Sequence, residues 1–181
     1  MYLTKEEEKM LESDNPAVSK AMEILVALGD IFGAEKLIKI KSAHVSGISY
    51  QNIGNEGLEW IEKLNAKVKV KTTINPAGMD LEKWKEMEID EEFYSKQIRI
   101  INAFKRLGAE ITLTCTPYLQ YTPKHGDILS WSESSAIIYA NSVLGAKTNR
   151  ESGISALAAA IIGKTPYYGL LIDENRKPSI I

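Results

Sequence analysis

A helix-like pattern followed by an alternating, strand-like pattern occurs three times, and this repetition constrains the fold more than any other feature. The three units span residues 15–47, 57–78 and 90–119. Asn15 before Pro16, and Asp90, are typical helix starts, while Gly33 and Gly108 are typical helix ends. Repeated helix–strand units with short connections predict an α/β fold with a mainly parallel sheet.

Polar side chains gather where the three predicted strands end. They are His44 and Ser46 after the first strand, Thr73 and Asn75 after the second, and Cys115 and Thr116 after the third. Ligands of parallel sheets bind beyond the carboxyl ends of the strands, so neighbouring strands would bring these groups into one site. The alternative interpretation is that they are ordinary turn residues.

The second and third predicted strands, KVKVKTT and ITLTCT, alternate strictly between polar and apolar residues. Strands covered by helices on both faces are usually apolar throughout. We therefore expect one face of the sheet to be solvated, or to be covered by something outside this chain.

The densest polar stretch follows residue 129. Ser130 and Glu133 have the spacing of a capping box and predict a helix start. Ser134 and Asn141 lie on one face of that helix, two turns apart, as do Ser135 and Ser142. Such a stripe could line a polar pocket or could pack against another helix, and both interpretations stay open.

A second capping-box spacing, from Thr148 to Glu151, predicts the start of the next helix. Arg150 would then lie in its first turn, where backbone N–H groups and a guanidinium together bind anions. The alternative is that Arg150 pairs with Glu151.

Composition narrows the class of protein. A net charge of −2 with scattered lysines gives no footprint for nucleic acid. The single cysteine excludes an internal disulfide and fits a reducing compartment. The two histidines are too few for a metal site, and no apolar run is long enough to cross a bilayer. We expect one α/β unit over residues 1–181, without a signal peptide, located in the cytoplasm and binding neither nucleic acid nor membrane.

Six segments resemble, in order, motifs at the start of the large chain of aconitase X proteins. They are MYLTKEEEKML, SAHVSGISYQNIG, TTINPAGMD, TLTCTPY, WSESSAIIYANSVLGAKTNRE and GISALAAAIIGKTPYYG. The resemblance implies an aconitase-like layered architecture and a hydro-lyase whose iron–sulfur cluster acts as a Lewis acid. It also implies a small subunit, or a fused small domain, that completes the active site. Known substrates of the family are 5-phosphomevalonate, in the archaeal mevalonate pathway, and cis-3-hydroxy-L-proline.

The resemblance assigns roles to individual residues. Cys115 falls on the first cluster cysteine, which implies an iron ligand, most simply of a 4Fe-4S cluster. The residues in motifs that line the site are Ser46, Asn75, Ser134, Asn141, Asn149 and Arg150. We expect polar contacts to an anionic substrate from them, with Arg150 binding a carboxylate or phosphate. The catalytic base is not identified.

Large chains of this family are longer than 181 residues, and their other cluster cysteines lie in the half that this sequence lacks. One cysteine cannot hold a cluster that needs three protein ligands. We therefore expect the N-terminal half of a catalytic chain, inactive alone, with the C-terminal half and a small subunit as partners. The start without a preceding small domain resembles the archaeal, two-subunit type. The alternative is a cluster-less binding or scaffold subunit for an anionic metabolite.

Overall fold

The computed structural model describes residues 1–177 and is built around a three-stranded parallel sheet. Its order is β3 (Lys71–Ile74), β2 (Ser42–Val45) and β4 (Leu129–Trp131). A separate antiparallel pair joins β1 (Leu37–Lys39) to β5 (Lys164–Pro166). The predicted α/β class with a mainly parallel sheet is confirmed. The last four residues of the expected unit lie outside the described range.

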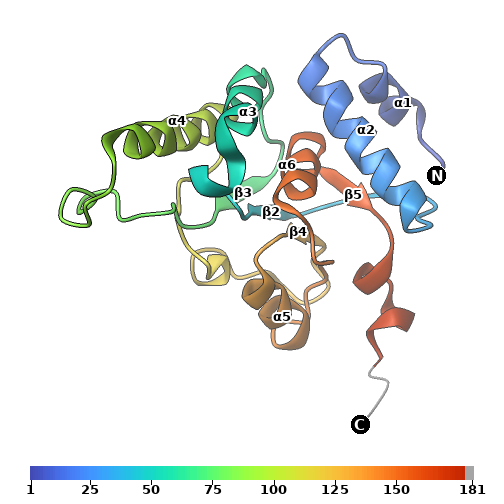
Figure 1. Ribbon diagram of the computed structural model, residues 1–181. Helices are drawn as coiled ribbons and strands as arrows, with labels where there is room; N and C mark the ends of the chain where they lie inside the picture. The colour runs from blue at the N-terminus through green and yellow to red at the C-terminus, as the bar shows by residue number, and fades with distance from the viewer. Residues whose placement is uncertain (178–181) are drawn as a thin grey trace.

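Helices cover both faces of the parallel sheet (Figure 1). The α-helices of the described residues are α1 (Lys5–Leu11), α2 (Pro16–Ile31), α3 (Tyr50–Lys63), α4 (Glu91–Leu107), α5 (Ser134–Ser142) and α6 (Gly153–Ile162), of which α1 packs against α2. Ala43 and Val45 of β2 face the main core, which α2, α3, α4 and α6 complete. Leu129 and Trp131 of β4 form a smaller core with α5. Across residues 1–177, none of these helices is long and apolar enough to span a membrane.

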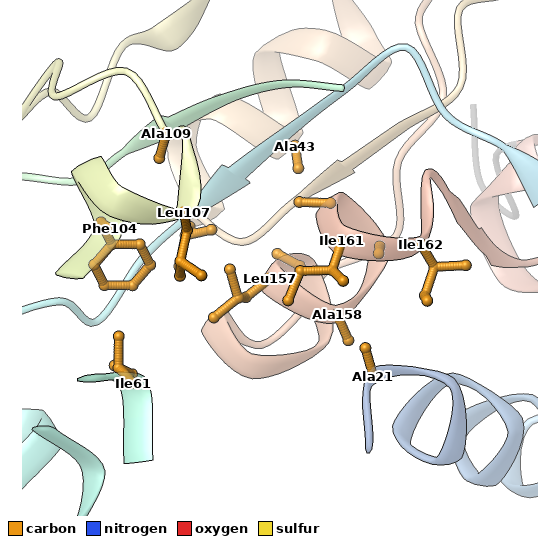
Figure 2. Close-up of a cluster of buried hydrophobic side chains, with 14 of the residues drawn as sticks. Ala21, Ala43, Ile61, Phe104, Leu107, Ala109, Leu157, Ala158, Ile161 and Ile162 are labelled. Atoms are coloured by element: carbon orange, nitrogen blue, oxygen red, sulfur yellow. The ribbon is translucent and has the colours of Figure 1, made fainter. Parts of the chain in front are cut away.

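Helix α6 lies at the centre of the main core. All its residues from Ser155 to Ile162 are buried. Figure 2 shows Leu157, Ala158 and Ile161 of this helix between Ala21 of α2 and Phe104 of α4. Its alanines favour helix and leave room for neighbouring elements to approach closely.

The predicted ends of the first and third helices are confirmed. The Asn15 and Asp90 side chains cap α2 and α4, and Gly108 ends α4 in the left-handed conformation with a φ of 93°. These ends depend on local chemistry alone, which explains why the sequence reveals them.

Both capping-box predictions near residues 130 and 148 are wrong. Ser130 lies inside β4, and the N-cap of α5 is Glu133, three residues after the predicted cap. Helix α6 begins at Gly153, capped by Ser152 instead of Thr148. Thr148 lies beside the sheet instead, and its hydroxyl accepts a hydrogen bond from the backbone N–H of Trp131 in β4 at 3.1 Å. Long-range pairing with β4 therefore outweighs the local capping signal.

The third predicted strand does not form. Glu110 makes a single bridge to Thr73, and the chain then turns at Leu113, whose φ is 46°. The Thr112 hydroxyl hydrogen-bonds both the N–H and the C=O of Ile74, at 3.2 and 3.0 Å, and so replaces regular backbone pairing. In the second unit only residues 71–74 form a strand.

The expectation of an uncovered sheet face is also wrong. All residues of β2 and β4 are buried, as are the last three of β3. Elements of this chain, α5 among them, bury the second face of the sheet, where polar groups satisfy one another. Trp131 Nε1, for example, donates to the Ser42 hydroxyl at 3.1 Å.

Candidate functional site

The carboxyl ends of β2 and β3 meet the start of α5 in a line of polar side chains. His44 of β2 lies beside Thr73 of β3, and a 2.7 Å hydrogen bond joins imidazole Nδ1 and Thr73 Oγ1. The other ring nitrogen, Nε2, lies 2.6 Å from Asn75 Oδ1. The Asn75 amide group then donates to Glu133 Oε2 at 2.7 Å. Three segments distant in sequence are thus joined at one edge of the sheet.

Cys115 lies near the far end of this line, where its exposed thiol is close enough to Glu133 for the negative charge of the carboxylate to act on it. Partial burial raises the pKa of the Cys115 thiol, and the negative charge of Glu133 raises it further. The four side chains His44, Asn75, Glu133 and Cys115 are called the strand-end network below.

The charges within the strand-end network follow from burial and hydrogen bonding. Burial lowers the pKa of His44, which is fully inaccessible, although the Asn75 hydrogen bond and the Glu133 charge oppose this. Burial would raise the pKa of Glu133, but hydrogen bonds from Asn75 and Ser135 hold it below its usual range. The network therefore joins a neutral imidazole to an ionised carboxylate.

A second set of hydrogen bonds joins the ends of β2 and β4. The Ser46 N–H donates to the Ser132 hydroxyl at 2.7 Å, and the Ser46 hydroxyl donates to the Ser132 carbonyl at 3.0 Å. The Ser132 hydroxyl in turn donates to the His44 carbonyl at 2.7 Å. These contacts fix the strand ends that carry the network.

The candidate site offers a metal centre one thiol ligand, that of Cys115. No group of three or more His, Cys, Asp or Glu side chains in the described part of the chain could hold a metal ion. Cys115 is accessible and can supply one ligand, but residues 1–177 do not form the complete ligand set of a cluster.

Of the residues predicted to line the site, Asn75 and Cys115 lie within the strand-end network and Ser46 lies beside it. Ser134 is exposed at the first turn of α5, next to Glu133. Arg150 is exposed and lies two residues before the cap of α6, outside the helix. Among the described residues it forms no ion pair, so the alternative pairing with Glu151 is not seen.

Two predicted site residues, Asn141 and Asn149, hold the C-terminal segment instead of joining the network. Asn141 Nδ2 donates to the Thr148 carbonyl, and its Oδ1 accepts from Arg176 at 2.6 Å. Asn149 Oδ1 accepts from the Leu170 N–H at 2.8 Å. These amides are engaged mainly with neighbouring backbone.

His44 and Glu133 are the site residues that sequence reasoning did not assign. His44 stood out only as part of a polar strand end. Glu133 was interpreted as the third helical residue of a capping box, and it is the helix cap itself. A carboxylate that caps a helix directly after a buried strand is the signal that could have identified it.

Comparison with known proteins identifies the family of this chain. The sequence profile described as the aconitase X first domain matches residues 1–174. The chain belongs to the aconitase X family. The crystal structure of Thermococcus kodakaraensis aconitase X in its holo form superposes with a TM-score of 0.89 at 55% identity, over 98% of this chain and 45% of that chain.

Relatives with assigned activities fall into two groups. The phosphomevalonate dehydratase large subunit of Methanocaldococcus jannaschii is 60% identical over all of this chain, which covers 46% of the relative. The cis-3-hydroxy-L-proline dehydratase of Hypocrea jecorina is 36% identical over 91% of this chain, which covers 28% of that relative. The chain thus spans less than half the length of these relatives.

Proposed function

We propose that this chain is the N-terminal part of the catalytic chain of a cytoplasmic hydro-lyase that removes water from (R)-5-phosphomevalonate, giving trans-anhydromevalonate 5-phosphate. The observation that carries the proposal is the 60% identity, over the whole chain, to a phosphomevalonate dehydratase large subunit. Identity to the hydroxyproline dehydratases is 36% and 32%, which favours phosphomevalonate over cis-3-hydroxy-L-proline.

In this proposal Cys115 supplies one ligand of an iron–sulfur cluster, and the other ligands come from protein outside residues 1–177. Such a cluster supplies a Lewis acid for the departing hydroxyl. The accessibility of the thiol at the edge of the sheet supports this assignment.

The remaining polar residues divide by their contacts. Arg150 is exposed and free to bind the substrate phosphate through a two-pronged hydrogen bond. Ser46, Asn75 and Ser134 lie around the strand ends and are proposed to contact substrate or to shape its site. Asn141 and Asn149 are proposed to act indirectly, by holding the segment that follows α6.

The proposed partners are the C-terminal half of the large chain and a small subunit. Apolar side chains on the surface support a partner. Four of them are each more than half exposed: Leu119, four residues after Cys115, Ile138 in α5, Val143 at its end, and Ile154 in α6. The second candidate function is a binding or scaffold subunit without a cluster. The observation that favours this second function is that the described residues contain a single thiol, whereas a cluster needs three protein ligands.

Anaerobic purification of the native protein from its source cells tests the proposal. Intact mass, iron, acid-labile sulfide and any co-purifying small subunit are measured, and turnover of both substrates is assayed. We expect a large chain with a cluster that dehydrates 5-phosphomevalonate and not hydroxyproline. A 20.1 kDa chain without iron or turnover would contradict the enzyme and favour the binding subunit.

A further inference from the structure

The strand-end network has a fixed direction of hydrogen donation. The Asn75 amide nitrogen lies 2.7 Å from Glu133 Oε2 and donates to it, because an amide nitrogen has no acceptor lone pair. The Asn75 oxygen must then face His44, which requires a proton on His44 Nε2. Neutral His44 therefore has a bare Nδ1, which accepts from the Thr73 hydroxyl. Each donor in the line points toward Glu133.

The location of the strand-end network indicates a role in the site in addition to a role in stabilising the core. A buried polar network stabilises a core only when each member is satisfied, so an apolar core would be the simpler solution for stability alone. Here the fully buried His44 connects through Asn75 to the partly accessible Glu133 carboxylate, whose charge acts on the exposed Cys115 thiol. The buried end is rigid and the accessible end is at the candidate site.

We propose that His44 is a positioning residue, which as the Nε2–H tautomer fixes the Asn75 amide and thereby directs the Glu133 carboxylate at the strand-end site. The inference rests on the proposed function only for the statement that this site performs the dehydration. His44 is fully buried and hydrogen-bonds Asn75, so it acts through Asn75 and Glu133.

The first experiment determines the tautomer in the 181-residue chain. Long-range proton–nitrogen correlation spectra at neutral pH report which imidazole nitrogen carries the proton. His125, which is exposed, is the only other histidine and serves as an internal reference. We expect a bare Nδ1 and a protonated Nε2 for His44. A proton on Nδ1, in either the neutral or the charged ring, would overturn the proposal.

The second experiment tests the consequence in the complete enzyme, with both subunits. Asn75→Asp keeps an acceptor for His44 but loses the N–H that holds Glu133. The matched control is Asn65→Asp, which makes the same change at an exposed position. We expect Asn75→Asp to lower kcat roughly 100-fold with a much smaller change in KM, because misplacement of a site group costs about that much. Asn65→Asp should be unchanged.

A pair of His44 variants separates positioning from packing. His44→Gln retains an N–H donor for Asn75, whereas His44→Leu does not. Partial rescue of kcat by glutamine over leucine supports the proposal, and equal kcat in the two variants would overturn it. An active wild-type enzyme with unimpaired Asn75→Asp would also reject the positioning role while leaving the function intact. An inactive wild-type enzyme with the expected tautomer would instead reject the function.

Discussion

Replacing Gly153 with alanine should destabilise the protein, because this glycine lets α6 approach the end of β2. A Cβ at position 153 would lie closer than 3.0 Å to the Ser46 carbonyl oxygen. Ser46 cannot easily yield, since its N–H and hydroxyl are both bonded to Ser132. Overpacking against fixed backbone costs about 1–3 kcal/mol, and the gain in helix propensity returns at most about 1 kcal/mol. The net loss should be about 1–2 kcal/mol.

The matched control is Gly29→Ala in α2. There the new Cβ would meet mainly the thioether of Met1, which is the far end of a flexible side chain. Alanine should leave stability unchanged or raise it by up to about 1 kcal/mol, through the ordinary preference of a helix for alanine.

Urea unfolding followed by far-ultraviolet circular dichroism measures both variants. For a chain of this size the expected loss in Gly153→Ala also lowers the Tm by roughly 2–8 °C. An m-value equal to that of the wild type would show that the change is in stability alone. If Gly153→Ala were as stable as the wild type, the close approach of α6 to Ser46 would be refuted.

Three further predictions concern the site, the C-terminal segment and the effect of pH. Cys115→Ser in the complete enzyme should abolish activity and lower iron content without moving the urea midpoint, because the thiol is exposed; retained iron would contradict its role as a ligand. Arg176→Ala should lower the free energy of unfolding by about 1–3 kcal/mol, since its guanidinium bonds the Leu170, Asn141 and Ala146 carbonyl oxygens; an unchanged urea midpoint would argue against this. The free energy of unfolding should fall as the pH drops below 6.5, because burial lowers the pKa of His44 and only the unfolded chain then takes up a proton at this residue. The dependence of this free energy on pH between 7 and 5.5 should be weaker in His44→Gln. An equal dependence in that variant would show that a group other than His44 causes it.

The helix ends of the fold were predictable wherever one side chain decides them. Asn15 and Asp90 accept hydrogen bonds from N–H groups two or three residues away, so the sequence contains the whole interaction. Segments near Ser130 and Thr148 carry the same kind of signal, but pairing with distant strands determines their conformation. Local patterns do not report that competition.

The candidate site was predictable as a place and only partly as a set of residues. The parallel sheet explains why His44 and Asn75 meet, since equivalent strand ends lie at one edge. Cys115 reaches the same edge although its segment is not a strand. Glu133 completes the network from the start of α5, and no periodicity in the sequence indicates that its carboxylate turns toward Asn75.

The strand order also affects how the protein is made. β2 is the central strand, and its neighbour β4 follows much later in the chain; the hydrogen-bonded His44 and Ser132 are 88 residues apart. At a ribosomal rate of roughly 5–20 residues per second, about 4–18 s pass between the synthesis of His44 and that of Ser132 just after β4. During that interval β2 has an unpaired edge, which a growing chain must protect from other strands. A chaperone that binds the nascent chain before residue 129 emerges would therefore have its largest effect on this strand.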